Sequence, residues 1–155
     1  MGERLEKLKA MLKKEQERRI KLNNRIGIFM AAVRHKLREQ AMTSLYQHLL
    51  LKKDIREAVY DVVGTNEIDP FLYTITIDAV KYKDSYIKQI DAQLRDGWTF
   101  ERLGFVERSI LLLACCEIDL ETAPKAIVIN EAITLAKRYC DDDTYKLVNG
   151  VLDRL

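Results

Sequence analysis

The chain has 155 residues, 48% of them hydrophobic, with 26 Lys plus Arg against 24 Asp plus Glu. That length supports one domain with its own core and excludes two large ones, and six Gly with two Pro exclude a collagen-like or low-complexity chain. No apolar run approaches the ~20 residues that cross a bilayer. The first residues, MGERLEKLK, lack the apolar segment of a secretory signal. We therefore expect a cytoplasmic protein without a membrane partner.

Basic side chains are concentrated at the N-terminal end. Residues 1–38 carry a net charge of +8, whereas residues 39–155 carry −6. A basic end joined to an acidic body favours a polyanionic partner, because Lys and Arg release the counterions condensed on phosphates. The alternative is a charged helix that is merely solvated.

Along the first 33 residues, apolar side chains recur at alternating three- and four-residue steps, the spacing of one helix face. Glu15 and Arg19 interrupt this seam. The pattern predicts a long first helix, with or without a break near Gly27. An exposed helix, a weak coiled coil and a frayed tail all remain compatible with so polar a seam. The apolar seam positions are Leu5, Leu8, Leu12, Leu22, Ile26, Phe29 and Val33.

Helical periodicity continues over residues 34–49 and again over 54–63, where Gly64 ends the second segment. Asp69 and Pro70 then predict a helix start. Asp is a favoured N-cap residue, and proline at the first helical position loses no hydrogen bond by lacking an N–H.

Alternating Thr and Ile over residues 73–77 give the only strand signal, a weak one. A further helix is expected over residues 82–94, closed by Gly97. The stretch from Thr99 to Ile118 is the most apolar of the chain. We therefore expect its helix to be the central one.

Pro124 restarts the chain, and the next helix, with Ile127 on its buried face, extends to Tyr139. The acidic residues 141–143 are expected to form a loop and the N-cap of a last helix, because the positive end of the helix dipole favours acids there. The pattern as a whole predicts an all-α bundle of about seven helices.

Signals for catalysis are missing from the sequence. It has no glycine-rich phosphate loop and no GxSxG or HExxH motif. Cys115, Cys116 and Cys140 follow neither a disulfide framework nor a metal-ligand spacing, so we expect reduced, structural thiols. The predicted protein is not an enzyme and uses no metal or other cofactor.

Arg34, His35, Lys36 and Arg38 are phosphate-binding candidates, with Tyr46 two turns further along the same helix. Guanidinium groups bind phosphates bidentately, and an aromatic ring stacks on an unpaired base. In the alternative interpretation, Tyr46 packs in the core and the basic side chains only solvate the helix.

Four segments closely resemble the NusB family of transcription antitermination proteins: RHKLREQAMTSLY at 34–46, VERSILLLACCEI at 106–118, INEAITLAK at 129–137 and YKLVNGVLD at 145–153. The resemblance implies an all-α, NusB-like helical bundle of two small subdomains over residues 34–155. Residues 1–33 would form a long, charged helical extension. It also implies binding of single-stranded boxA RNA together with a small-subunit ribosomal protein acting as NusE, on the elongating RNA polymerase complex.

Carried over residue by residue, the resemblance places RNA-binding residues in an early helix and before the last helix, and predicts that they converge on one surface. Leu147 stands where the family often has an aromatic residue, which removes a possible stacking ring. The RNA-binding candidates are Arg34, His35, Lys36, Arg38, Tyr46, Asp143, Thr144, Lys146 and Leu147. The candidates for contact with the ribosomal protein are Glu107, Ile110 and Ala114.

The sequence thus predicts an antitermination factor that binds boxA-type RNA in nascent rRNA transcripts. Two alternatives stay open. In one, the chain is a scaffold protein that self-associates through its N-terminal helix, giving a possible homodimer. In the other, it is a free-standing accessory domain of an RNA-modifying enzyme.

Overall fold

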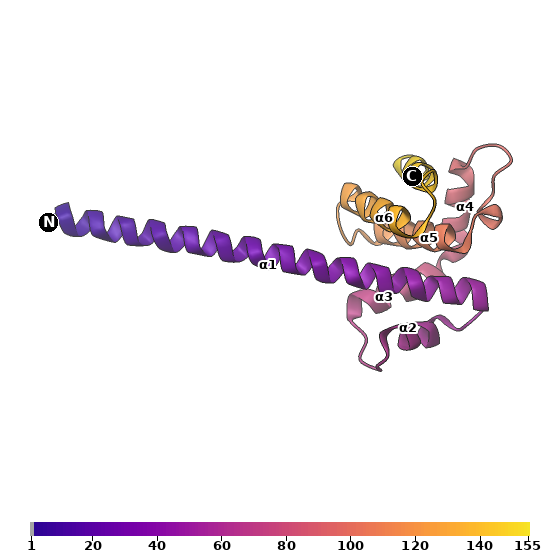
Figure 1. Ribbon diagram of the computed structural model, residues 1–155, viewed down its shortest axis with the longest axis horizontal. Coiled ribbons are helices and arrows are strands. Elements are labelled where there is room, and N and C mark those ends of the chain that lie inside the picture. Colours follow the sequence, from indigo (N-terminus) through magenta and orange to yellow (C-terminus); the bar gives the residue numbers. More distant parts are fainter. Residues whose placement is uncertain (1) are drawn as a thin grey trace. The chain divides into compact units, whose positions relative to one another are not determined.

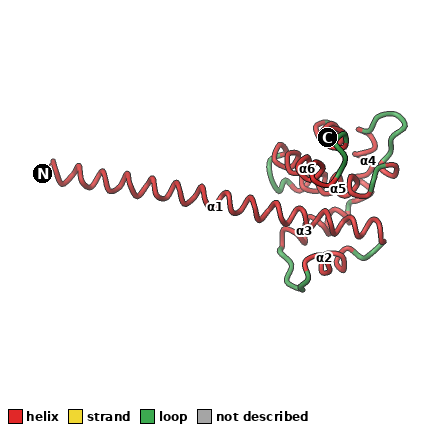
Figure 2. Tube along the Cα trace, viewed as in Figure 1, coloured by secondary structure: helices red, strands yellow, loops and turns green. Residues whose placement is uncertain are grey.

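The computed structural model describes residues 2–155, and every regular element among them is helical (Figure 2). The all-α prediction is therefore confirmed. Within the same residues, no helix is both long enough and apolar enough to span a bilayer. The elements are α1 (Gly2–Leu51), α2 (Ile55–Val63), α3 (Pro70–Lys81), α4 (Lys83–Gln93), a 3-10 turn η1 (Phe100–Arg102), α5 (Phe105–Leu120), α6 (Lys125–Tyr139) and α7 (Thr144–Asp153).

The chain divides into an N-terminal unit that ends at Lys36 and a C-terminal unit from Leu37 to Leu155. The described part of the N-terminal unit is helical throughout, because α1 continues without a break past Gly27. Nothing lies within 4 Å of the position that a Cβ would take at Gly27. The unit's surface is charged, and Glu15 lies 3.7 Å from Arg18 and 3.6 Å from Arg19 along the helix. Such pairs contribute about 0.2–0.5 kcal/mol each to an isolated helix.

The C-terminal unit is built around α5, as the apolar run predicts. Residues 109–117 of this helix are all buried, and α5 packs against α3, α4, α6 and α7 (Figure 1). Helix α2 pairs with α3, and α6 pairs with α7. Helix α5 contacts both of these pairs, and residues 37–155 form one compact unit.

Two helix starts follow the sequence closely. Asp54 caps α2 by accepting the N–H of Arg56 at 3.0 Å, and Asp69 caps α3 by accepting the N–H of Phe71 at 2.8 Å. Gly64 ends α2 with φ 82°, in the left-handed region. A side-chain acceptor at the N-cap and a glycine after the helix end are local signals, and here both are correct.

Three expectations are wrong in detail. Residues 73–77 are helical, because Ile75, Thr76 and Ala79 lie on the buried face of α3 at helical spacing. Ile127 is 47% exposed, and Val128, one position on, is buried instead. Asp143 occupies the N-cap position of α7, but its side chain makes no capping hydrogen bond.

Candidate RNA-binding groove

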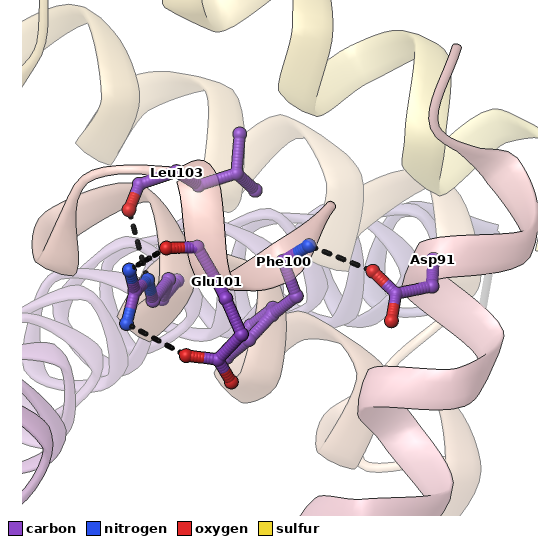
Figure 3. Close-up of polar contacts among 5 residues, drawn as sticks. Asp91, Phe100, Glu101 and Leu103 are labelled. Atoms are coloured by element: carbon purple, nitrogen blue, oxygen red, sulfur yellow. Dashed lines mark hydrogen bonds and ion pairs between the residues drawn. The ribbon is translucent and has the colours of Figure 1, made fainter. Parts of the chain in front are cut away.

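The loop between α4 and α5 is tied to the helix before it. The N–H of Trp98 donates to the carbonyl of Arg95 at 2.9 Å, and Gly97 has φ 86°, which glycine adopts without strain. Further on, Asp91 Oδ1 accepts the N–H of Phe100 at 2.7 Å (Figure 3). Hydrogen bonds therefore hold the backbone of the loop at both Trp98 and Phe100.

Arg108 of α5 holds the far end of this loop. Its Nε donates to the Leu103 carbonyl at 2.8 Å, and its guanidinium also binds the carbonyl and the carboxylate of Glu101 (Figure 3). The same guanidinium stacks on the rings of Phe100, at 5.7 Å, and Phe105, at 4.5 Å. The buried ring of Phe100 and the hydrogen bonds of Arg108 thus fix the position of the loop on α5.

A groove lies between this loop and α7. Its larger part encloses about 340 Å³, and a second hollow shares Trp98, Asp143 and Leu147 with it. Trp98 is 50% exposed, so its ring is accessible from solvent. The groove therefore combines an apolar floor, an exposed indole and polar side chains from α7.

Cationic side chains outnumber acidic ones along the groove. Arg95, Arg102, Lys146 and Arg154 line it, against Asp143 and Glu107. The guanidinium of Arg102 lies 5.7 Å from the centre of the Trp98 ring. Fixed cations beside an accessible ring can bind phosphates and stack on a base at the same time.

Four predicted RNA-binding residues meet in this groove: Asp143, Thr144, Lys146 and Leu147. Sequence reasoning missed the opposite wall, which carries Arg95, Trp98 and Arg102, and it also missed Arg154 at the end of α7. A signal was present, because the single tryptophan follows a turn glycine and has an arginine on either side in RDGWTFER.

The prediction that Arg38 binds RNA phosphate needs a correction, because the side chain is buried in the core. It is 5% exposed, and its Nε lies 3.0 and 2.9 Å from the two carboxylate oxygens of Glu117 on α5. Its Nη2 lies 2.9 Å from the same carboxylate, to which Thr122 also donates. A guanidinium enclosed in the core and already bound to a carboxylate cannot also bind RNA phosphate.

The other early candidates are not among the residues that line the groove. Arg34 and His35, both half-buried, and the exposed Lys36 belong to the N-terminal unit. Tyr46 is half-buried in α1 and lines neither part of the groove.

Within the C-terminal unit, α1 contacts the C-terminal end of α6. Glu39 pairs with Arg138 at 3.2 Å and accepts a hydrogen bond from Tyr139, the last residue of α6. The loop that leads to α7 begins directly after this contact.

Two of the three predicted partner-binding residues are also corrected. Ile110 and Ala114 are 1% and 2% exposed and belong to the hydrophobic core. They therefore offer no docking surface. Glu107 is half-buried at the edge of the groove, where its carboxylate accepts a hydrogen bond from the Cys140 thiol. Burial is the main cause that raises the pKa of this thiol to about 12, and the nearby Glu107 carboxylate raises it further.

All three cysteines are free thiols, two of them buried. Burial is the main cause that raises the pKa of Cys115 and Cys116 to about 12. Both thiols therefore stay protonated at neutral pH, as expected of packing residues. Among residues 2–155, no group of three metal-ligating side chains comes together.

The fold and the groove define a small all-helical protein whose groove carries four cationic side chains beside an exposed indole. A model of the NusB family matches residues 35–155. The chain is 38% identical over 126 residues to the transcription antitermination protein NusB of Exiguobacterium sp., which covers 79% of this chain and 95% of the relative. It is 33% identical over 123 residues to the NusB of Geobacillus kaustophilus, covering 79% and 94%. The chain belongs to the NusB family of transcription antitermination proteins.

Solved structures agree with this assignment. The crystal structure of antitermination factors NusB and NusE in complex with dsRNA gives a TM-score of 0.70 at 28% identity and covers 78% of this chain and 93% of that one. T. maritima NusB gives a TM-score of 0.67 at 27% identity, covering 78% of this chain and 88% of that one. The region of likeness is the C-terminal part of the chain, since the family match begins at residue 35.

Proposed function

We propose that this chain is a non-enzymatic antitermination factor that acts in the cytoplasm and binds boxA-type single-stranded RNA in the groove between the α4–α5 loop and α7. The observation that carries the proposal is the set of four cationic side chains around an exposed Trp98. Phosphates would contact the cations and release counterions, while an unstacked base would stack on the indole.

A small-subunit ribosomal protein acting as NusE is the expected co-partner, on the elongating RNA polymerase complex. The support is the solved complex of a relative NusB with NusE and RNA. Glu107 remains the candidate for this contact, because it is the one predicted partner residue outside the core. Joint binding predicts reciprocal coupling, so each partner should tighten the binding of the other.

Arg34, His35 and Lys36 remain proposed phosphate contacts on the strength of the family resemblance. Their contribution would be electrostatic, with the sequence preference coming from the groove. Replacing Lys36 by Ala should therefore weaken binding to boxA and to an unrelated single strand by similar factors.

The test is a titration of the full chain with boxA RNA, followed through the fluorescence of Trp98, the only tryptophan present. We expect quenching on binding, and we expect Lys146→Ala to lower the slope of log affinity against log salt by about one. Lys88→Ala is the matched control, because Lys88 is an exposed lysine of α4 outside the groove lining. Equal salt slopes for the two variants would refute the groove as the RNA site.

Strandedness is tested in the same assay. The indole can stack only on an accessible base, so a boxA single strand should quench Trp98 more strongly than the corresponding duplex. The solved complex of the relative holds dsRNA. Equal quenching by the single strand and the duplex would mean that the protein recognises the phosphate backbone alone, without stacking of a base on Trp98.

A further inference from the structure

The N-terminal unit exposes an apolar seam with two charged positions at its centre. The six leucine, isoleucine and phenylalanine side chains of the seam are each at least 50% exposed, and with Glu15 and Arg19 between them the positions recur at three- and four-residue steps. This is the a and d pattern of a heptad, which keeps one stripe of a helix facing a partner helix. The six side chains are Leu5, Leu8, Leu12, Leu22, Ile26 and Phe29.

Glu15 and Arg19 occupy the two central positions of the seam, a d and an a position respectively. In a parallel pair of helices, each layer holds identical residues, so Glu15 would face the partner's Glu15 and Arg19 the partner's Arg19. Like charges placed directly opposite each other are unfavourable. In an antiparallel pair, every a position faces a d position of the other helix. Glu15 at d can then face the partner's Arg19 at a, so that opposite charges meet.

We propose that the N-terminal helix forms an antiparallel coiled coil with a second copy of this chain, on a two-fold axis beside Glu17. In this register Glu15 faces the partner's Arg19, and the same contact is repeated across the axis. The flanking layers are all apolar: Leu12 faces the partner's Leu22, Leu8 the partner's Ile26, and Leu5 the partner's Phe29. One surface therefore complements itself, as a two-fold interface requires.

The charges select this register over its neighbours. Sliding one helix by a heptad in either direction would place Glu15 against the partner's Leu12 or Ile26. The same shift would place Arg19 against the partner's Leu8 or Leu22. Each shifted register buries both charges against apolar side chains without a counter-charge, which is costly.

Within one helix, the same groups are held in reach of each other. Glu15 lies 3.6 Å from Arg19 and 3.7 Å from Arg18 of its own chain. Arg18 flanks the seam near the proposed axis, so the Arg18 side chains of the two copies would approach each other there. The two Glu15 carboxylates would offset their repulsion. The inference does not depend on the proposed function.

The first test is the mass of the full chain by sedimentation equilibrium. We expect a dimer whose dissociation constant rises by more than about tenfold in Glu15→Arg and in Arg19→Glu, because each change sets like charges opposite each other. The double variant E15R/R19E should restore the dimer. Glu17→Arg is the matched control, since it makes the same charge change on the outer face of the helix. A monomeric wild-type chain, or a dimer that all four variants leave intact, would overturn the proposal.

A second test fixes the direction of pairing, in a Cys140→Ser background that leaves only buried native thiols. Leu12→Cys and Leu22→Cys should form a disulfide when the two variants are mixed. Neither should cross-link with itself, because the antiparallel register separates identical positions by about 15 Å, well beyond disulfide reach. Cross-linking of each variant with itself, and none in the mixture, would show a parallel pair and refute the register.

Discussion

Leu12, in the N-terminal unit, is 62% exposed, whereas Leu45, on the same helix in the C-terminal unit, is completely buried. The ion pairs differ in the same way. Glu6 and Lys9 pair at 3.4 Å on the surface, and Arg38 pairs with Glu117 inside the core. Helix α1 therefore carries one periodic pattern into two environments. Periodicity identifies which face of a helix is apolar, but the rest of the fold decides what covers that face.

The buried ion pair should give the largest difference between the units. Glu117→Ala leaves the Arg38 guanidinium in the core without its carboxylate, and we expect unfolding to become easier by about 3–5 kcal/mol. Glu6→Ala breaks an exposed pair and should change stability by less than about 0.5 kcal/mol. Urea unfolding measures both, followed by Trp98 fluorescence for the C-terminal unit and by circular dichroism for the N-terminal helix. Losses of similar size would mean that the Arg38–Glu117 pair does not support the core.

The two leucines give the next largest contrast. Leu45→Ala removes a side chain with no exposed surface and should cost about 2–5 kcal/mol through lost burial and a residual cavity. Leu12→Ala should leave the unfolding of the C-terminal unit unchanged. It should act only on self-association, which sedimentation measures separately. A clear loss of C-terminal stability in Leu12→Ala would show that the two units are energetically coupled.

Most of the C-terminal fold was accessible from the sequence because its signals are local. The caps at Asp54 and Asp69 and the stop at Gly64 each depend on one residue and its immediate neighbours. The centrality of α5 follows from its composition. Errors arose where two periodicities compete over a few residues, as in 73–77, where alternating Thr and Ile also fit a helix with Ile75 and Thr76 buried.

The site was only half predictable. Residues 143–147 were assigned through a family resemblance, and the structure places them in the groove. Arg38 was misassigned, because its partner Glu117 lies 79 positions away and nothing local shows that the pair is buried. Trp98 was missed because its exposure depends on the fixed loop that Asp91 and Arg108 hold. Long-range pairing and loop geometry are the two properties that sequence patterns do not contain.

Trp98 provides a third contrast, between a groove residue and a core residue. Trp98→Ala should weaken RNA binding by about tenfold or more, as expected for the loss of one base stack. Because the ring is 50% exposed, stability should change little compared with Leu45→Ala. Trp98→Phe keeps a ring and should retain most of the affinity. Fluorescence anisotropy with labelled RNA provides the measurement, and an unaffected Trp98→Ala variant would remove base stacking from the proposed mechanism.

Two glycines, one in each unit, should respond to the same substitution with opposite signs. Gly27 lies in regular helix with open space around its Cβ position, so Gly27→Ala should stabilise α1 by about 0.5–1 kcal/mol. Gly97 also has open space, but its φ of 86° is strained for alanine, so Gly97→Ala should destabilise the groove loop by about 1 kcal/mol.

Circular dichroism measures the first effect, and the loss of RNA affinity together with the urea midpoint measures the second. Because neither Cβ meets a neighbouring atom, packing cannot explain a difference in sign, and backbone conformation alone would account for it. A stabilising Gly97→Ala would mean that the loop takes another conformation in solution, and that Trp98 is not held where the groove needs it.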